Sequence, residues 1–174
     1  MVTAPEPLVR VRTMKASDVR YAAALHRECL PHGLFPALGC RFLGHYLFSY
    51  ATSPFGLALV AEVDGRPAGF LVGTSDGRAH REHVLRQHGT SLAMRAGTAM
   101  ICRPTVAWRF LRTRLVRYAI GFIRRRSPST APSDEPESPT AVLSHVAVAP
   151  SARGSGAGTT LVNSFVQRVR ATEA

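Results

Sequence analysis

Cysteines and long apolar runs are scarce in this 174-residue sequence. The three cysteines are odd in number and have no metal-ligand spacing, which argues against a disulfide framework or a zinc site and favours free thiols in a reducing cytosol. Residues 1–12 contain two prolines and no long apolar region, so they do not resemble a secretory signal. The longest uncharged stretch, residues 42–61, is broken by Ser53, Pro54 and Gly56 and is therefore a poor candidate for a membrane span.

Acidic side chains are also few, with 11 Asp and Glu against 22 Lys and Arg, and the imbalance is local. Residues 77–126 hold twelve arginines and one acid, Glu82, so this segment carries a net charge equal to the whole formal charge of +11. A charge concentrated in this way indicates a surface that meets a partner. The next segment, residues 127–139 (SPSTAPSDEPESP), is rich in proline, serine and acids, which predicts a disordered linker.

A glycine-rich turn lies near the C-terminus. Residues 141–149 form an apolar run of strand character, which is followed by Arg-Gly-x-Gly-x-Gly and by an amphipathic segment over residues 159–170. This order places unpaired backbone N–H groups at the start of a helix, where they and the helix dipole bind anions. Glycines let a phosphate approach the backbone without meeting a Cβ atom. The pattern therefore predicts a phosphate-binding loop, with a ligand-free glycine turn as the alternative.

Two common phosphate loops do not fit the spacing. A Walker A loop needs a lysine after its last glycine, but Gly158 is followed by Thr159. A Rossmann loop needs G-x-G-x-x-G, whereas the spacing here is G-x-G-x-G. The stretch Val146–Gly158 instead resembles motif A of the GNAT acyl-CoA N-acyltransferases, whose pattern is V-x-P-x-x-R-G-x-G-x-G/A. The matching positions are Val148, Pro150, Arg153, Gly154, Gly156 and Gly158.

The order of the predicted elements agrees with this resemblance. Alternation predicts a first strand over residues 9–14, and apolar spacing predicts helices over residues 18–30 and 36–51. Residues 57–63 and 67–73, joined by Asp-Gly, predict a β-hairpin. The resemblance thus implies an α/β fold of the α+β kind with a mixed sheet.

In this interpretation residues 1–174 form a single GNAT-like domain. Residues 77–126 are a basic helical insertion between the third and fourth strands. Members of the family continue with further strands after the motif-A helix, so we expect the domain to be C-terminally incomplete. A partner chain or a homo-oligomer is one source of the missing strands.

The second half of the insertion has the pattern of an amphipathic helix. Apolar side chains recur at helical spacing over residues 104–126, with arginines mostly opposite them. Such a helix can dock on the protein's own core, bind an anionic membrane or lipid-linked substrate, or bind nucleic acid, for which the sequence offers the least support. In the first half, His80, Arg81, Glu82, His83 and His88 lack a closed ligand set, which predicts a solvated helix face and no metal.

The resemblance also implies a binding mode for acetyl-CoA. The pantetheine arm would pair with the backbone of the motif strand, and the pyrophosphate would lie on the glycine loop. The implied cofactor contacts are Val146, Ala147, Val148, Arg153, Gly154, Ser155, Gly156, Ala157, Gly158 and Thr159. The acceptor amine would attack the thioester carbon directly, and a strand N–H near Val148 would stabilise the oxyanion.

His145 is the only titratable side chain on the motif strand, and its ordinary pKa suits a general base. Strand alternation argues against this role, because His145 then shares a face with Leu143 and Ala147 and opposes Ser144. A packed position against a helix is the alternative interpretation. His145 is therefore a catalytic candidate with a competing structural explanation.

Two functions follow from these observations. The first is a cytoplasmic N-acetyltransferase that transfers the acetyl group of acetyl-CoA to a primary amine of a small molecule or amino sugar, peripheral to the membrane if the insertion binds lipid. The alternative is an inactive or partial acyl-CoA-binding module whose basic helices form an interaction surface. The sequence does not identify the acceptor.

Overall fold

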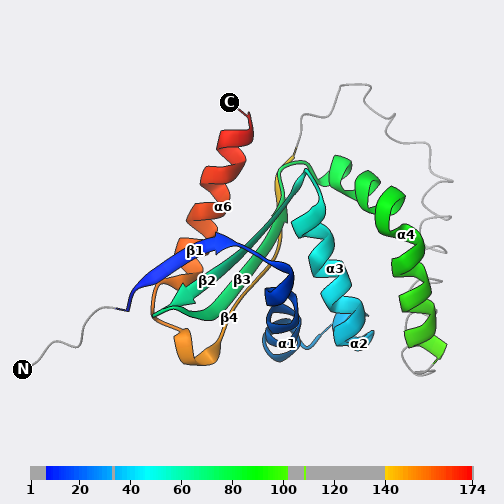
Figure 1. Ribbon diagram of the computed structural model, residues 1–174, viewed down its shortest axis with the longest axis horizontal. Coiled ribbons are helices and arrows are strands. Elements are labelled where there is room, and N and C mark those ends of the chain that lie inside the picture. Colours follow the sequence, from blue (N-terminus) through cyan, green and yellow to red (C-terminus); the bar gives the residue numbers. More distant parts are fainter. Residues whose placement is uncertain (1–6, 33, 102–107, 109–139, 174) are drawn as a thin grey trace, which may run out of the picture.

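The computed structural model describes residues 7–32, 34–101, 108 and 140–173 (Figure 1). Four strands and five α-helices are named within these residues. In chain order the elements are β1 (Val9–Thr13), η1 (Ala16–Asp18), α1 (Val19–Cys29), α2 (Leu34–Ala37), α3 (Cys40–Thr52), β2 (Gly56–Val63), β3 (Arg66–Thr74), α4 (Gly77–Ile101), β4 (Val142–Val148), η2 (Pro150–Ala152) and α6 (Ala157–Glu173).

The four strands form one sheet in the order β1-β2-β3-β4, and each neighbouring pair is antiparallel. The predicted hairpin is confirmed. Asp64 and Gly65 both have positive φ angles, of 50° and 75°, which are the angles that a two-residue turn between twisted strands requires. Among the described residues β4 has a strand on one side only, so its other edge is free of strands.

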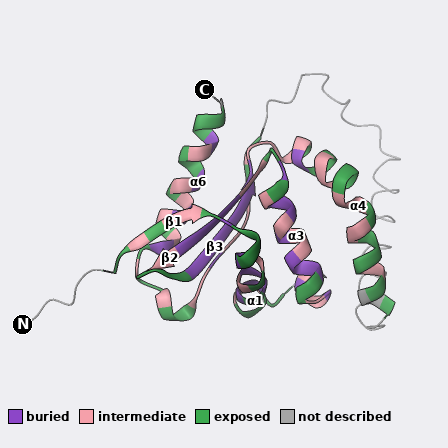
Figure 2. Ribbon diagram, in the orientation of Figure 1, coloured by how far each residue is buried: buried purple, intermediate pink, exposed green. Residues whose placement is uncertain are grey.

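Helices cover both faces of this sheet. α6 packs on one face and α1 and α3 pack on the other (Figure 1). Because side chains alternate along each strand, β2 and β3 contribute to both layers: Leu59 and Leu71 pack beneath α6, whereas Val60 and Phe70 pack beneath α1 and α3. Figure 2 shows the buried positions concentrated on these central strands. The two apolar layers hold the C-terminal end of β4 and the start of α6 in fixed positions.

The second predicted helix is interrupted. Residues 36–51 were expected to form one helix, but α2 ends at Ala37 and α3 begins at Cys40. Gly39 lies between them with a φ of 95°, in the left-handed region that glycine adopts without strain. This turn changes the chain direction and lets α3 pack against both α1 and β2.

α4 is the described part of the segment between β3 and β4. Asp76 begins it, because its carboxylate accepts the backbone N–H groups of Arg78 and Ala79 at 2.9 and 3.0 Å. The helix then crosses α3. No helix among the described residues is both long and apolar enough to cross a membrane. The predicted helix over residues 104–126 and the predicted linker over residues 127–139 lie outside the described residues, Trp108 excepted.

Candidate active site

The glycine loop joins β4 to α6. After β4 the chain makes one turn of η2, and Gly154 and Gly156 then adopt φ angles of 84° and 82°. A Cβ atom built on either glycine meets nothing within 4 Å, so both backbone units border open space. Gly158 is in a different environment, because a Cβ there would make an ordinary van der Waals contact with Val148, at 3.5 Å. The first two glycines shape the loop, and the third packs α6 on the strand.

Several backbone N–H groups of the loop have no acceptor among the described residues. The amides of Ala152, Arg153 and Ser155 bond to carbonyls within the turn. The amides of four neighbouring residues remain without a partner, and they are Gly154, Gly156, Gly158 and Thr159. They stand at the N-terminus of α6, where the helix dipole adds positive potential. Such an arrangement can accept an anion.

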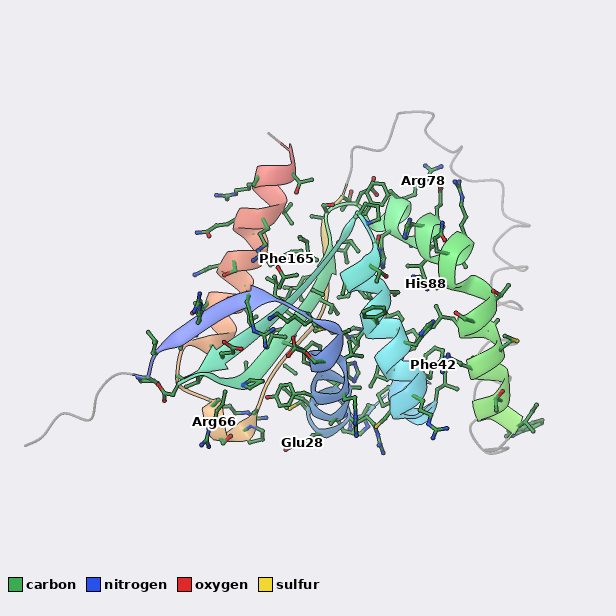
Figure 3. All side chains as sticks on the ribbon, viewed as in Figure 1. Glu28, Phe42, Arg66, Arg78, His88 and Phe165 are labelled. Atoms are coloured by element: carbon green, nitrogen blue, oxygen red, sulfur yellow. The ribbon has the colours of Figure 1, made fainter. Side chains whose placement is uncertain are left out.

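A hollow of about 570 Å³ lies against this loop, on the side of the β2–β3 turn. Its wall includes Arg153, Gly154 and Ser155 from the loop and Arg66 from the start of β3. Arg66 appears beside the loop in Figure 3. Both arginines are exposed. The hollow therefore combines two guanidinium groups with the glycine backbone, which suits a phosphate group.

The free edge of β4 leads directly into the glycine loop. The N–H of Ala149 bonds to the carbonyl of Ala68, 2.8 Å away, so this residue turns its backbone towards β3. Because backbone groups alternate along a strand, Val148 and Val146 turn theirs to the open edge. In the part of the chain that the structure describes, the carbonyl of Val148 has one donor, the weak thiol of Cys29, 3.7 Å from its oxygen. An extended ligand can pair with this edge.

β4 is irregular in its first half. Val72 pairs with His145, and the next residue of β3, Gly73, pairs with Leu143, so Ser144 is the extra residue of a bulge. The bulge breaks the alternation that the sequence analysis assumed. Although Ser144 was expected to face away from His145, its hydroxyl lies 3.2 Å from the hydroxyl of Tyr50 on α3.

His145 lies on the face of the sheet that α1 and α3 cover, in the packed position that was its alternative interpretation. Its ring is 4.8 Å from the ring of His26 on α1 and 5.9 Å from that of Tyr46 on α3. Burial lowers the pKa of His145, and the neighbouring His26 lowers it further. The side chain is therefore a neutral imidazole at pH 7, held in a partly buried aromatic cluster.

A second cavity, of about 590 Å³, opens between α3, α4 and the first half of β4. Its aromatic side is formed by Phe35, Tyr46 and Tyr50. The hydroxyls of Tyr46 and Tyr50 lie 2.8 Å apart, and that of Tyr50 also reaches Ser144. No carboxylate lines this cavity among the described residues. The remaining wall residues are Ser49, Thr74, Gly77, His80, Arg81, Val84, Leu85, Val142 and Ser144.

His80 is the titratable base in the wall of this cavity. Its side chain was predicted to lie on a solvated helix face, but it is 7% exposed and its ring centroid is 4.4 Å from that of Tyr50. Only the outward neighbours Arg81 and Glu82 follow the prediction. Among the described residues, neither the buried Nδ1 of His80 nor the hydroxyl of Thr74, which lines the same cavity, has a hydrogen-bond partner. Burial lowers the pKa of His80, with a smaller contribution from His83.

The predicted residues thus fall in two groups. The loop residues and the edge of β4 lie together at one end of the strand, whereas His145 lies on the covered face. Tyr46, Tyr50 and His80 were missed. The spacing of Tyr46 and Tyr50, four residues apart on one helix, was the available signal for a shared surface. Among the described residues no three His, Cys, Asp or Glu side chains gather as a metal-ligand group.

Comparisons with known proteins agree on one family. The model of the acetyltransferase (GNAT) family matches residues 101–174, which include β4, the glycine loop and α6. A search of curated protein sequences finds no match. Among solved structures, aminoglycoside N-acetyltransferase AAC(6')-Iy, in complex with CoA, is 12% identical, with a TM-score of 0.52 over 99% of this chain and 76% of that chain.

Two further solved structures are similar in part. Aminoglycoside antibiotic 6'-N-acetyltransferase AAC(6')-Ih from Acinetobacter baumannii is 14% identical, covering 95% of this chain and 74% of that chain with a TM-score of 0.49. A protein described as histone acetyltransferase HPA2 and related acetyltransferase, from Corynebacterium glutamicum, is 16% identical over 94% of this chain and 72% of that chain, with a TM-score of 0.49. Residues 101–174 thus match a GNAT acetyltransferase domain, and the fold of the chain is similar to that of a solved N-acetyltransferase.

Proposed function

We propose that the protein is an acyl-CoA N-acyltransferase that uses acetyl-CoA and acetylates a primary amine of a small molecule or amino sugar. The observation that carries this proposal is the glycine loop. Four amides without a partner among the described residues lie there around the start of α6, and Arg153 and Arg66 line the adjoining hollow. The outer edge of the preceding strand is free of described strands. Such a loop can bind a pyrophosphate, and such a strand edge can pair with an extended ligand that contains amide groups. A CoA thioester has both parts.

In this proposal the pyrophosphate lies on residues 153–159, with Arg153 and Arg66 paired to its oxygens. The pantetheine arm runs along β4 beside Val146 and Val148. The thioester then reaches the bulge at Ser144, which borders the aromatic cavity. The cavity of about 590 Å³ is the acceptor site, and its volume suits one small molecule.

The reaction is a direct transfer. The neutral acceptor amine attacks the thioester carbon, a strand N–H beside the bulge at Ser144 stabilises the oxyanion, and the C–S bond breaks as the C–N bond becomes an amide. CoA leaves as a thiolate, which takes up a proton. The amine loses one proton to a general base.

We assign the role of this general base to His80. Its buried Nδ1 lacks a partner inside the cavity wall, and its lowered pKa keeps it unprotonated at neutral pH. His145, the base predicted from sequence, is the second candidate. Its ring does not line the cavity, but it touches Tyr46, which is hydrogen-bonded to Tyr50.

The test uses the full 174-residue chain. Calorimetric titration with CoA and acetyl-CoA measures binding, and release of free thiol in the presence of a panel of amines measures turnover. Binding with amine-dependent thiol release supports the enzyme. Binding without turnover for any amine favours the alternative, an acyl-CoA-binding module with a basic interaction surface. If the chain binds neither CoA nor acetyl-CoA, both proposed functions are wrong.

A further inference from the structure

A separate groove of about 760 Å³ lies between α1, α3 and the second half of α4. It shares no residue with the two hollows of the candidate active site. Small and apolar side chains form its floor, among them Val19, Ala23 and Phe48, and Gly44 brings α3 close to α1. The floor is an apolar channel that opens to solvent.

Arginines surround this floor. Arg20, Arg41 and Arg95 line the groove from three different helices, and all three are exposed. Arg27, which lies one turn of α1 beyond Ala23, donates to the sulfur of Cys40 at 2.9 Å. Among the described residues no carboxylate pairs with any of these arginines, and none lines the groove. The positive charge of the rim is therefore uncompensated.

Contacts with α3 fix the position of α4 above the groove. His45 lies 2.9 Å from the hydroxyl of Ser91, and His88 lies 3.3 Å from that of Thr52. Figure 3 shows His88 on the side of α4 that faces α3. The pKa of His45 is lowered by burial and further by Arg95 and His88, as expected where positive groups gather without acids. Arg95 is thus held beside the arginines of α1 and α3.

Large apolar side chains are exposed on the same part of the chain. Met94 is 71% exposed, Ile101 is 84% exposed and Trp108 is 67% exposed. Met94 is next to Arg95 in the sequence. Ile101 lies seven residues, about two helical turns, after Met94, so Met94 and Ile101 lie on the same side of α4. Isolated exposed apolar side chains are ordinary, but Met94 and Ile101, on the helix that carries Arg95, add apolar surface to an arginine-rimmed apolar groove. This combination indicates an apolar partner with negative charge.

We propose that this groove and the adjoining apolar side chains of α4 bind the surface of an anionic membrane. An acyl chain would lie on the floor beside Phe48, and lipid phosphates would pair with Arg20, Arg41 and Arg95. The apolar floor favours lipid over nucleic acid, whose phosphates would use the arginines but leave the floor and the exposed Met94 and Ile101 without a role.

The test measures binding of the full chain to vesicles. Flotation with vesicles of phosphatidylcholine containing phosphatidylglycerol should retain the protein, vesicles of phosphatidylcholine alone should not, and rising salt should release it. Trp108 is the only tryptophan, so its emission should shift to shorter wavelength on binding to anionic vesicles. Polyuridylate at equal phosphate concentration is the nucleic-acid comparison, and it should bind more weakly.

A matched pair of variants locates the surface. Arg41→Gln/Arg95→Gln should lower vesicle affinity on the order of 30-fold, since each basic residue near an anionic surface accounts for a factor of about five. Arg10→Gln/Arg170→Gln removes the same charge elsewhere and should change it far less. The proposal would be overturned if both pairs of variants lost vesicle affinity equally, or if the wild-type chain bound no vesicles at all. Equal binding to neutral vesicles, or stronger binding to polyuridylate, would overturn it as well. CoA affinity, which the proposed function requires, should be the same in both pairs.

Discussion

The hydroxyl of Tyr50 lies 3.2 Å from the hydroxyl of Ser144, although 94 positions separate the two residues in the chain. Tyr50 belongs to α3, which packs against the middle of the sheet, and Ser144 is the extra residue of the β4 bulge. The bond therefore joins the one irregular point of the motif strand to the helix that lines the proposed acceptor cavity. It fixes the shape of the cavity where the thioester is expected to react.

The first prediction concerns this bond. Tyr50→Phe and Ser144→Ala should each lower stability by about 1 kcal/mol, because each removes one hydrogen-bonding partner at a partly buried site. Their effects should not add: a double-mutant cycle in urea should give a coupling of about 0.5–1.5 kcal/mol. Tyr46→Phe is the control, since its hydroxyl bonds to Tyr50 but not to Ser144. Strict additivity of the Tyr50 and Ser144 effects would mean that the two hydroxyls do not interact.

The second prediction concerns the loop. Gly156→Val should lower the affinity for CoA by at least tenfold, because it places a side chain where the phosphates would approach and strains a backbone with a φ of 82°. Gly39→Val is the matched control. Its φ is 95°, so valine carries a similar backbone strain there, and Gly39 lies between α2 and α3, outside the wall of the phosphate hollow. Calorimetry should show near-normal CoA binding in the control. Equal affinity in both variants would exclude the loop from the phosphate site.

Much of this architecture could be predicted from the sequence because its signals are local. The Asp-Gly turn between two alternating runs determines the hairpin, and the strand, proline and glycines identify the loop before α6. Both features depend on neighbouring residues whose backbone preferences are known. The turn at Gly39 was missed because the apolar spacing of the two flanking helices continues across it.

The acceptor cavity could not be predicted in the same way. Its wall joins α3, α4 and β4, and their contacts depend on tertiary packing. The bulge at Ser144 reverses the direction of one side chain, and no local pattern marks it. His80 lies among polar residues that indicate a solvated helix, yet α4 turns this one position onto Tyr50. Residues that meet only in the folded chain leave little trace in single-sequence periodicity.

The third prediction concerns pH and stability. His26 is 2% exposed, neither ring nitrogen has a partner, and burial lowers its pKa below 6.5. The unfolded chain therefore binds more protons than the folded one below pH 6.5, so stability should fall as the pH is lowered from 7 to 5. Thermal unfolding across this range should show the decline. His26→Leu should make the decline shallower without abolishing it, because the lowered pKa values of His45, His80 and His145 contribute to it as well. The variant should cost little at pH 7, because it removes two unsatisfied polar atoms. A wild-type stability that is constant or rises on acidification would contradict this.

The fourth prediction tests the base. If His80 accepts the amine proton, His80→Gln should reduce kcat by roughly 10²–10⁴, the usual contribution of general-base catalysis, with little change in CoA affinity. His83→Gln is the control on the same helix, since His83 lies outside the cavity wall. The pH profile separates a base from a packing residue. Because burial lowers the pKa of His80, the wild-type rate should stay high through neutral pH and fall only when the pH drops below 6.5. This acidic limb should vanish in His80→Gln. If the acidic limb persists in His80→Gln and disappears in His145→Gln, the base is His145. Tyr46 and Tyr50 then connect His145 to the cavity.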